Sequence, residues 1–167
     1  MLYEFCAENV TLLEKAMQSG ARRIELCDNL AVGGTTPSYG VTKAAVELAA
    51  NYDTTIMTMI RPRGGDFVYT DLEIAIMLED IRLTAQAGSQ GVVFGALTAD
   101  KKLDKANLEK LIAASKGMEI VYHMAFDELS DEDQLEAIDW LSQAGVARIL
   151  TRAGVSGDSL EKRFAHY

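Results

Sequence analysis

Residues 144–149 read AGVARI, and the same arrangement occurs twice before, as SGARRI at 19–24 and AGSQGV at 87–92. In each copy a small residue and a glycine end a helical pattern, and a new run leading into a strand begins directly afterwards. A glycine at this place takes the left-handed conformation that ends a helix, so each copy predicts a helix stop followed by a strand. Three copies predict a chain assembled from repeated pairs of strand–helix units.

The rest of the chain alternates in the same way. Strands are predicted at 2–8, 22–28, 54–61, 91–97, 119–126 and 147–151, and helices at 10–19, 41–52, 71–87, 107–115, 133–144 and, as a last start, 158–164. Strands that alternate with amphipathic helices are typical of a parallel sheet. The repeat favours a TIM-type (β/α) barrel over a doubly wound sheet, and no GxGxxG motif follows the first strand. We therefore predict an α/β fold in which residues 1–167 form one domain, an incomplete barrel with about six of the usual eight units and a short C-terminus.

Composition limits the functions that need to be considered. Apolar residues make up 49% of the chain and charged residues 25%, as in soluble globular proteins. A formal net charge of −9 with scattered basic residues argues against a nucleic-acid partner. No apolar run approaches the roughly 18 residues of a membrane span, and the first residues lack the features of a secretory signal. We predict no membrane partner and a cytoplasmic location.

Alternation along the strands predicts which side chains face the barrel lumen. The apolar face of each strand should pack against the helices, which leaves the polar face for the lumen. The polar faces carry Glu4, Cys6, Glu8, Glu25, Cys27, Arg61, His123, Asp127 and Thr151. Because functional sites of such barrels lie at the carboxyl ends of the strands, we expect these groups to converge on one mouth.

These groups also have purely structural interpretations. Glu4, Glu25 and Arg61 would equally form a buried salt-bridge network that fills the barrel. Cys6 and Cys27 would serve as small core residues, because two cysteines without CxxC spacing are a weak metal signal. No lysine lies in a predicted strand, which argues against a Schiff-base aldolase.

The loop after the third predicted strand reads RPRGGDFVY at 61–69. We expect it to place Arg61 and Arg63 over the barrel mouth, while its two glycines let the backbone approach a neighbour closely. In the alternative interpretation, Asp66 pairs with Arg63 and stiffens the loop.

Several blocks of the sequence resemble the CutC copper homeostasis proteins. They are EFCAEN at 4–9, RIELCDNLAVGGTTPSYG at 23–40, MIRPRGGDFVYTDLEIAIMLEDI at 59–81, GVVFGALT at 91–98, YHMAFDE at 122–128 and ARILT at 147–151. The resemblance implies a TIM barrel, a role in copper handling, and binding of Cu(I) through Cys6 and Cys27. Thiolates are ligands that Cu(I) prefers. This chain departs from the family pattern at Met124, where an arginine is usual, and the family continues through two further strands.

Three functions are left open by the sequence: the two given next, and a regulatory or assembly role through oligomer surfaces with the barrel as a platform. The first is a copper homeostasis protein that binds Cu(I) through the cysteine pair at the barrel mouth. The second is a TIM-barrel enzyme that acts on a small polar or anionic substrate, with candidate catalytic residues Glu8, Glu25, Arg61, His123 and Asp127. The first and sixth strands would be unpaired edges, so we also predict a homo-oligomer.

Overall fold

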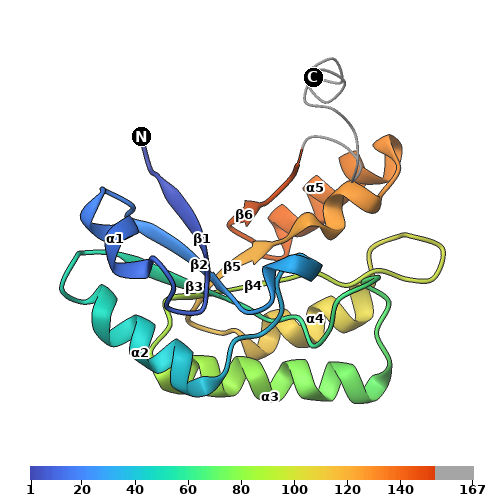
Figure 1. Cartoon of the computed structure of the whole chain (residues 1–167). Helices are drawn as coiled ribbons and strands as arrows, with labels where there is room; N and C mark the ends of the chain where they lie inside the picture. Colours follow the sequence, from blue (N-terminus) through green and yellow to red (C-terminus); the bar gives the residue numbers. More distant parts are fainter. Residues whose placement is uncertain (153–167) are drawn as a thin grey trace.

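The computed structural model of the protein describes residues 1–152. Six parallel strands in this part form one sheet in sequence order: β1 (Glu4–Glu8), β2 (Arg23–Cys27), β3 (Thr55–Met59), β4 (Gly91–Phe94), β5 (Glu119–Tyr122) and β6 (Arg148–Ile149). The connections contain α1 (Leu13–Gln18), η1 (Leu30–Val32), α2 (Tyr39–Ala49), α3 (Asp71–Ala87), α4 (Lys105–Ala114), η2 (Met124–Glu128) and α5 (Asp131–Gln143), where η denotes a 3-10 helix. The helices follow the outer side of the curved sheet (Figure 1), which confirms the predicted incomplete barrel of TIM type.

The three repeated glycines end their helices as predicted. Gly20, Gly88 and Gly145 have φ angles of 101°, 89° and 86°, in the region that only glycine adopts without strain. Each lies between a helix and the next even-numbered strand. The last predicted helix, at 158–164, lies outside the described residues.

Two boundaries differ from the sequence prediction for a local reason. Helix α1 begins at Leu13 rather than at residue 10, because Leu12 has a φ angle of 57° and turns the chain just before the helix. Strand β5 ends at Tyr122 because the next residues form η2, whose first turn is capped by the imidazole of His123. We had expected Asp127 on a strand face, but it lies in this 3-10 helix.

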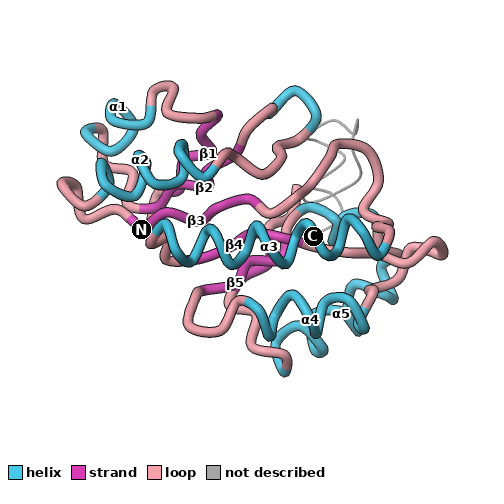
Figure 2. Tube along the Cα trace, turned by 90° about the horizontal axis from the view of Figure 1, so that it is seen from below, coloured by secondary structure: helices cyan, strands magenta, loops and turns pink. Residues whose placement is uncertain are grey.

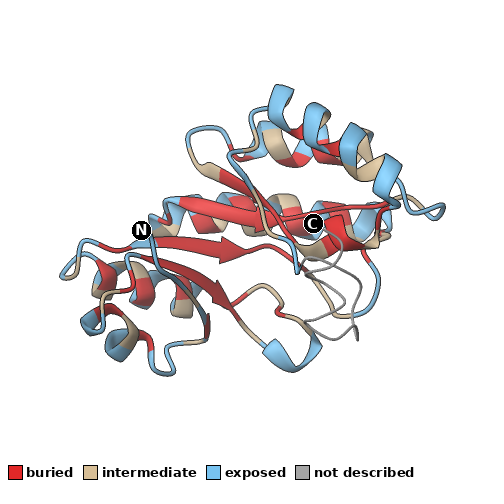
Figure 3. Cartoon of the chain, turned by 90° about the horizontal axis from the view of Figure 1, so that it is seen from above, coloured by how far each residue is buried: buried red, intermediate tan, exposed pale blue. Residues whose placement is uncertain are grey.

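The two faces of the sheet have different surroundings. On the helix side, Ile24, Leu26 and Ile56 are fully buried against α1 and α2, as the alternation predicts. On the lumen side, a smaller cluster contains Cys27, Met57, Met59, Val93 and Val121. Figure 2, seen from below, shows α3 in front of the strands, and Figure 3 shows the central strands largely buried while the outer faces of the helices are exposed.

Candidate functional site

Strand register brings the two cysteines and one carboxyl group together. In the parallel β1–β2 ladder, Cys6 is opposite Glu25 and Glu8 is opposite Cys27. Directly opposed residues point to the same side of the sheet, so all four side chains face the lumen. The two cysteines are thus diagonal neighbours, with Glu25 beside both.

The distances within this group are short enough for one ion. The two sulfurs and one carboxylate oxygen of Glu25 all lie within 4.8 Å of one another. The Cys6 thiol donates to Glu25 Oε1 at 3.4 Å, and the Cys27 thiol donates to the same oxygen at 3.8 Å. The other oxygen, Oε2, is buried and has no hydrogen-bond partner among the described residues.

The surroundings disfavour the charged forms of Glu25 and Cys27. Burial raises the pKa of Glu25, and the nearby Glu4 carboxyl acts in the same direction. The hydrogen bond with Cys6, together with burial and the charge of Glu25, raises the pKa of the Cys27 thiol. A cation that takes these thiolates must therefore displace protons.

The two thiols differ in access. Cys6 is exposed, and Cys27 is fully buried. A Cβ atom at Gly34 would lie 3.0 Å from the Cys27 sulfur, so only a glycine lets this loop pass so close over the thiol. Glu8 holds the same loop, because its Oε2 accepts the backbone N–H of Leu30 at 2.6 Å. Glu8 is therefore a support for the loop and not a member of the thiol group.

A salt-bridge network occupies the lumen, but it shares only Glu4 with the predicted one: its arginines are Arg23 and Arg148, and its second carboxylate is Glu119 instead of Glu25. Arg23 is 2% exposed and forms ion pairs with Glu4 at 2.6 Å and with Glu119 at 2.7 Å. Arg148 adds a third pair with Glu119 at 2.9 Å. These residues lie at the strand starts, so they close the end of the lumen opposite to the functional mouth.

We had expected Arg61 to extend over the mouth, but its side chain is buried. Its guanidinium donates to the backbone carbonyls of Val32 and Gly34 at 2.8 and 2.9 Å, and to that of Gly65 at 2.9 Å. These bonds join the β2–α2 and β3–α3 loops. The close approach predicted for the glycines also occurs, because a Cβ atom at Gly64 would lie 2.8 Å from Cβ of Val32.

Arg63 pairs with Asp66, as the structural interpretation predicts. The two lie 3.0 Å apart, and Arg63 Nε also donates to Glu73 at 2.5 Å, at the start of α3. Glu73 belongs to a capping box with Thr70, in which each side chain accepts the other's backbone N–H. The loop is thereby tied to the first turn of α3.

Replacement of Thr70 by alanine removes the cap of α3. We expect a loss of about 1 kcal/mol in the free energy of unfolding, because the backbone N–H of Glu73 then has no acceptor in the helix start. Denaturant titration measures this loss. Thr70→Ser keeps the hydroxyl and should stay close to wild type; equal losses in both variants would contradict the capping explanation.

His123 and Asp127 are buried near each other in sequence but have separate partners. His123 Nδ1 accepts the Ala125 N–H at 3.2 Å. Asp127 accepts the Thr151 hydroxyl at 2.5 Å and the backbone N–H of Arg152 at 2.9 Å. Asp127 thus has a structural role: it holds the segment after β6 in place. Thr151 contributes to this role as one of the two hydrogen-bond donors.

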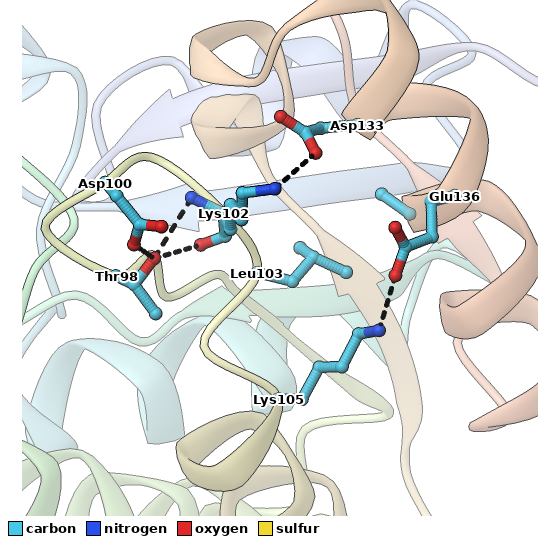
Figure 4. Close-up of a pocket in the computed structure, with 8 residues that line it drawn as sticks. Thr98, Asp100, Lys102, Leu103, Lys105, Asp133 and Glu136 are labelled. Carbon is cyan, nitrogen blue, oxygen red and sulfur yellow. Dashed lines mark hydrogen bonds and ion pairs between the residues drawn. The ribbon is translucent and has the colours of Figure 1, made fainter.

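A hollow of about 320 Å³ lies beside α5, and both lysines in its lining form ion pairs there. Lys102 is 3.3 Å from Asp133 and Lys105 is 2.7 Å from Glu136 (Figure 4). The Thr98 hydroxyl donates to a neighbouring carboxylate in the same loop. Because its lysines are already paired with carboxylates, this surface is a weaker candidate than the lumen.

Comparison with known proteins identifies the family. The model of the CutC family matches residues 1–163. A family protein CutC of Enterococcus faecalis is 51% identical over 166 residues, which cover 99% of this chain and 79% of that protein. The chain belongs to the CutC family. A CutC family protein of Streptococcus pyogenes serotype M6 is also 51% identical, over 90% of this chain and 72% of its own length.

Solved structures agree with this assignment. The crystal structure of the putative copper homeostasis protein CutC from Streptococcus agalactiae superposes with a TM-score of 0.95 at 44% identity, over 99% of this chain and 79% of that one. A putative phosphonomutase from Burkholderia cenocepacia gives a TM-score of 0.67 at 18% identity, over 90% of this chain and 62% of that one, which shows a shared fold alone. No helix in the described part of this CutC chain has the length and apolarity needed to cross a membrane.

Two lumen residues of this CutC chain were missed by the sequence analysis. Arg23 shares the lumen face with Glu25, two positions away, so the alternation that selected Glu25 also selects Arg23. Gly95 lies two positions after Val93 and leaves space for the ring of His123, since a Cβ there would lie 2.7 Å from the ring. A glycine on a lumen face was a usable signal for a close approach.

Proposed function

We propose that this CutC family protein handles copper by binding Cu(I) between the thiolates of Cys6 and Cys27. The observation that carries the proposal is the Cys6–Glu25–Cys27 group, whose ligand atoms lie within 4.8 Å of one another on the lumen face. Cu(I) prefers soft sulfur ligands over carboxylate oxygen. The two thiolates are therefore the ligands, and the copper ion is cargo carried by the protein.

Glu25 has a supporting task in this proposal. Its Oε1 accepts both thiol hydrogens, so the carboxyl group is already in contact with the protons that Cu(I) must displace. Metal binding to thiolates releases protons and weakens as the pH falls. The difference in burial assigns an order: exposed Cys6 meets the ion first, and buried Cys27 holds it.

An anaerobic Cu(I) titration against a chromogenic chelator tests the proposal. We expect the wild-type chain to withdraw one Cu(I) from the chelator, more weakly at lower pH, and to release protons in proportion. Zn²⁺ is the matched control, because a structural zinc site has four protein ligands and this group offers two sulfurs. Failure to compete with the chelator at any pH would refute the copper site.

The alternative function and the assembly of the chain stay predictions. An enzyme that acts on a small anionic substrate gains support from one observation, the buried Arg61 and His123 at the mouth. The homo-oligomer is expected because, within residues 1–152, β1 and β6 each pair with a strand on one side only. The cytoplasmic location rests on the sequence.

A further inference from the structure

One layer of the lumen lies beyond the thiol group and takes no part in the copper proposal. In the ladders, Met59 is opposite Val93 and Val93 is opposite Val121. Two residues after Met59, Val93 and Val121 come Arg61, Gly95 and His123, respectively. Because side chains alternate with a period of two, these positions belong to the lumen side at the carboxyl ends of β3, β4 and β5.

Arg61 brings a buried positive charge to this layer. Its side chain is 2% exposed, and no carboxylate forms an ion pair with it among residues 1–152. Both terminal nitrogens donate to backbone carbonyls, which are neutral, while Nε is buried without a hydrogen-bond partner. A buried charge is costly unless a charge of opposite sign accompanies it.

His123 supplies a second unused donor. It is completely buried, and its Nδ1 accepts the Ala125 N–H. The ring is neutral, because burial and the charge of Arg61 lower its pKa to about 3. In a neutral imidazole with an accepting Nδ1, the hydrogen is on Nε2. That atom is buried and has no partner in the described part of the chain.

Neighbouring residues hold the two donors in one region. The centroid of the Phe67 ring lies 4.9 Å from the centroid of the His123 ring and 5.0 Å from the guanidinium carbon of Arg61. Gly95 separates the two strands that carry the donors, and any side chain there would press on His123. Within residues 1–152 this layer therefore contains the Arg61 charge and two buried N–H groups without a hydrogen-bond partner; the buried hydroxyl of Tyr69, which lies beside Arg61, also has none.

We propose that Arg61 and His123 form a binding site for a small oxyanion, a carboxylate or phosphoryl group of a ligand, at the carboxyl ends of β3 and β5. The oxyanion neutralises the guanidinium and accepts the N–H groups of Arg61 Nε and His123 Nε2. Hydrogen bonds in which one partner is charged are the stronger kind in proteins. The site is separate from the cysteine pair and is independent of copper binding.

Equilibrium binding of malonate and of inorganic phosphate, each at constant ionic strength, tests the site and separates its two ligand classes. We expect saturable binding of one anion per chain, with either probe or both, at millimolar concentration or below. The chain has a net charge of −9, so general attraction of anions cannot produce this result. In proton–nitrogen NMR spectra of the two histidines, the Nε2–H signal of His123 should move downfield on saturation.

Two substitutions of His123 separate donation at Nε2 from the cap made by Nδ1. His123→Asn can still accept the Ala125 N–H but lacks the Nε2 donor, and we expect it to bind the anion about tenfold more weakly or worse. His123→Gln restores an N–H near the Nε2 position and should recover part of the affinity. Gly95→Ala provides a second route, because it displaces the ring without changing a polar group.

Three results would overturn the site. The first is the absence of saturable binding of both probes to the wild-type chain, which needs no variant. The second is equal binding by wild type, His123→Asn and Gly95→Ala. The third is binding that leaves the His123 ring signals unchanged. Copper binding by the same preparation is measured in parallel, so that either proposal can fail alone.

Discussion

Replacement of Cys27 by serine is expected to abolish competitive Cu(I) binding. Loss of even an outer partner of a metal ligand typically lowers affinity 10–100-fold, so loss of one of two thiolates should exceed about 100-fold. Serine is nearly the same size but offers a hard, protonated oxygen, which Cu(I) does not favour. The chelator competition used for the wild type measures the loss directly.

Three further variants show whether the loss is specific. Cys6→Ser should have the same effect, whereas Glu25→Gln should leave a weaker but measurable site, because Glu25 contacts both thiols without being a preferred ligand. Met57→Leu is the matched core control, since Met57 is buried in the same cluster as Cys27. Full Cu(I) binding by the Cys27→Ser chain, with its folded circular dichroism spectrum intact, would exclude the thiolate site.

The second large effect concerns the buried guanidinium of Arg23. Glu4→Gln combined with Glu119→Gln should destabilise the protein by about 3 kcal/mol, because it leaves this 2% exposed charge without a carboxylate. This value is at the lower end of the cost usually found for removing one partner of a buried ion pair, because the two glutamate side chains are 34% and 37% exposed. Denaturant titration at neutral pH measures the change in the free energy of unfolding.

Adding Arg23→Met to the double variant tests the cause. If the penalty comes from an unpaired buried charge, the triple variant should recover part of the lost stability. Glu79→Gln breaks an exposed pair with Arg82 and serves as a control that should unfold like wild type. A triple variant less stable than the double variant would show that the contacts of the Arg23 side chain matter more than its charge.

The same network predicts a response to acid. Burial alone would raise the pKa of Glu119, but hydrogen bonds from Arg148 and Arg23 outweigh it and lower the pKa. A carboxyl with a lowered pKa in the folded state stabilises the protein above its unfolded pKa of about 4.3, and this contribution is lost as the pH falls through the folded value. The double variant should therefore lose less stability than wild type below pH about 4.

Much of the fold could be read from local patterns. The glycine stops at 20, 88 and 145 and the alternation of Ile24 and Leu26 with polar residues depend on neighbours in sequence, so they are visible without coordinates. Where a single residue changed the chain direction, prediction failed. Leu12 in a left-handed conformation shortened α1, and the cap made by His123 ended β5 early.

The candidate site was found only in part for the same reason. Period-two alternation placed Cys6, Glu25 and Cys27 on the lumen side, which the register confirms. The partner of each polar group could not be found in this way. Arg61 was expected among carboxylates but donates to loop carbonyls, and Glu4 pairs with Arg23.

The sequence by itself determined the order of elements and placed Cys6, Glu25 and Cys27 on the lumen faces of their strands, because these follow from backbone geometry over a few residues. Only the tertiary structure decided that Glu25 lies between the two thiols, since this depends on the register of β1 against β2. It alone decided that Arg61 and His123 are buried with unused donors. Register and loop closure are set by packing between distant segments, and no local pattern encodes which distant groups will meet.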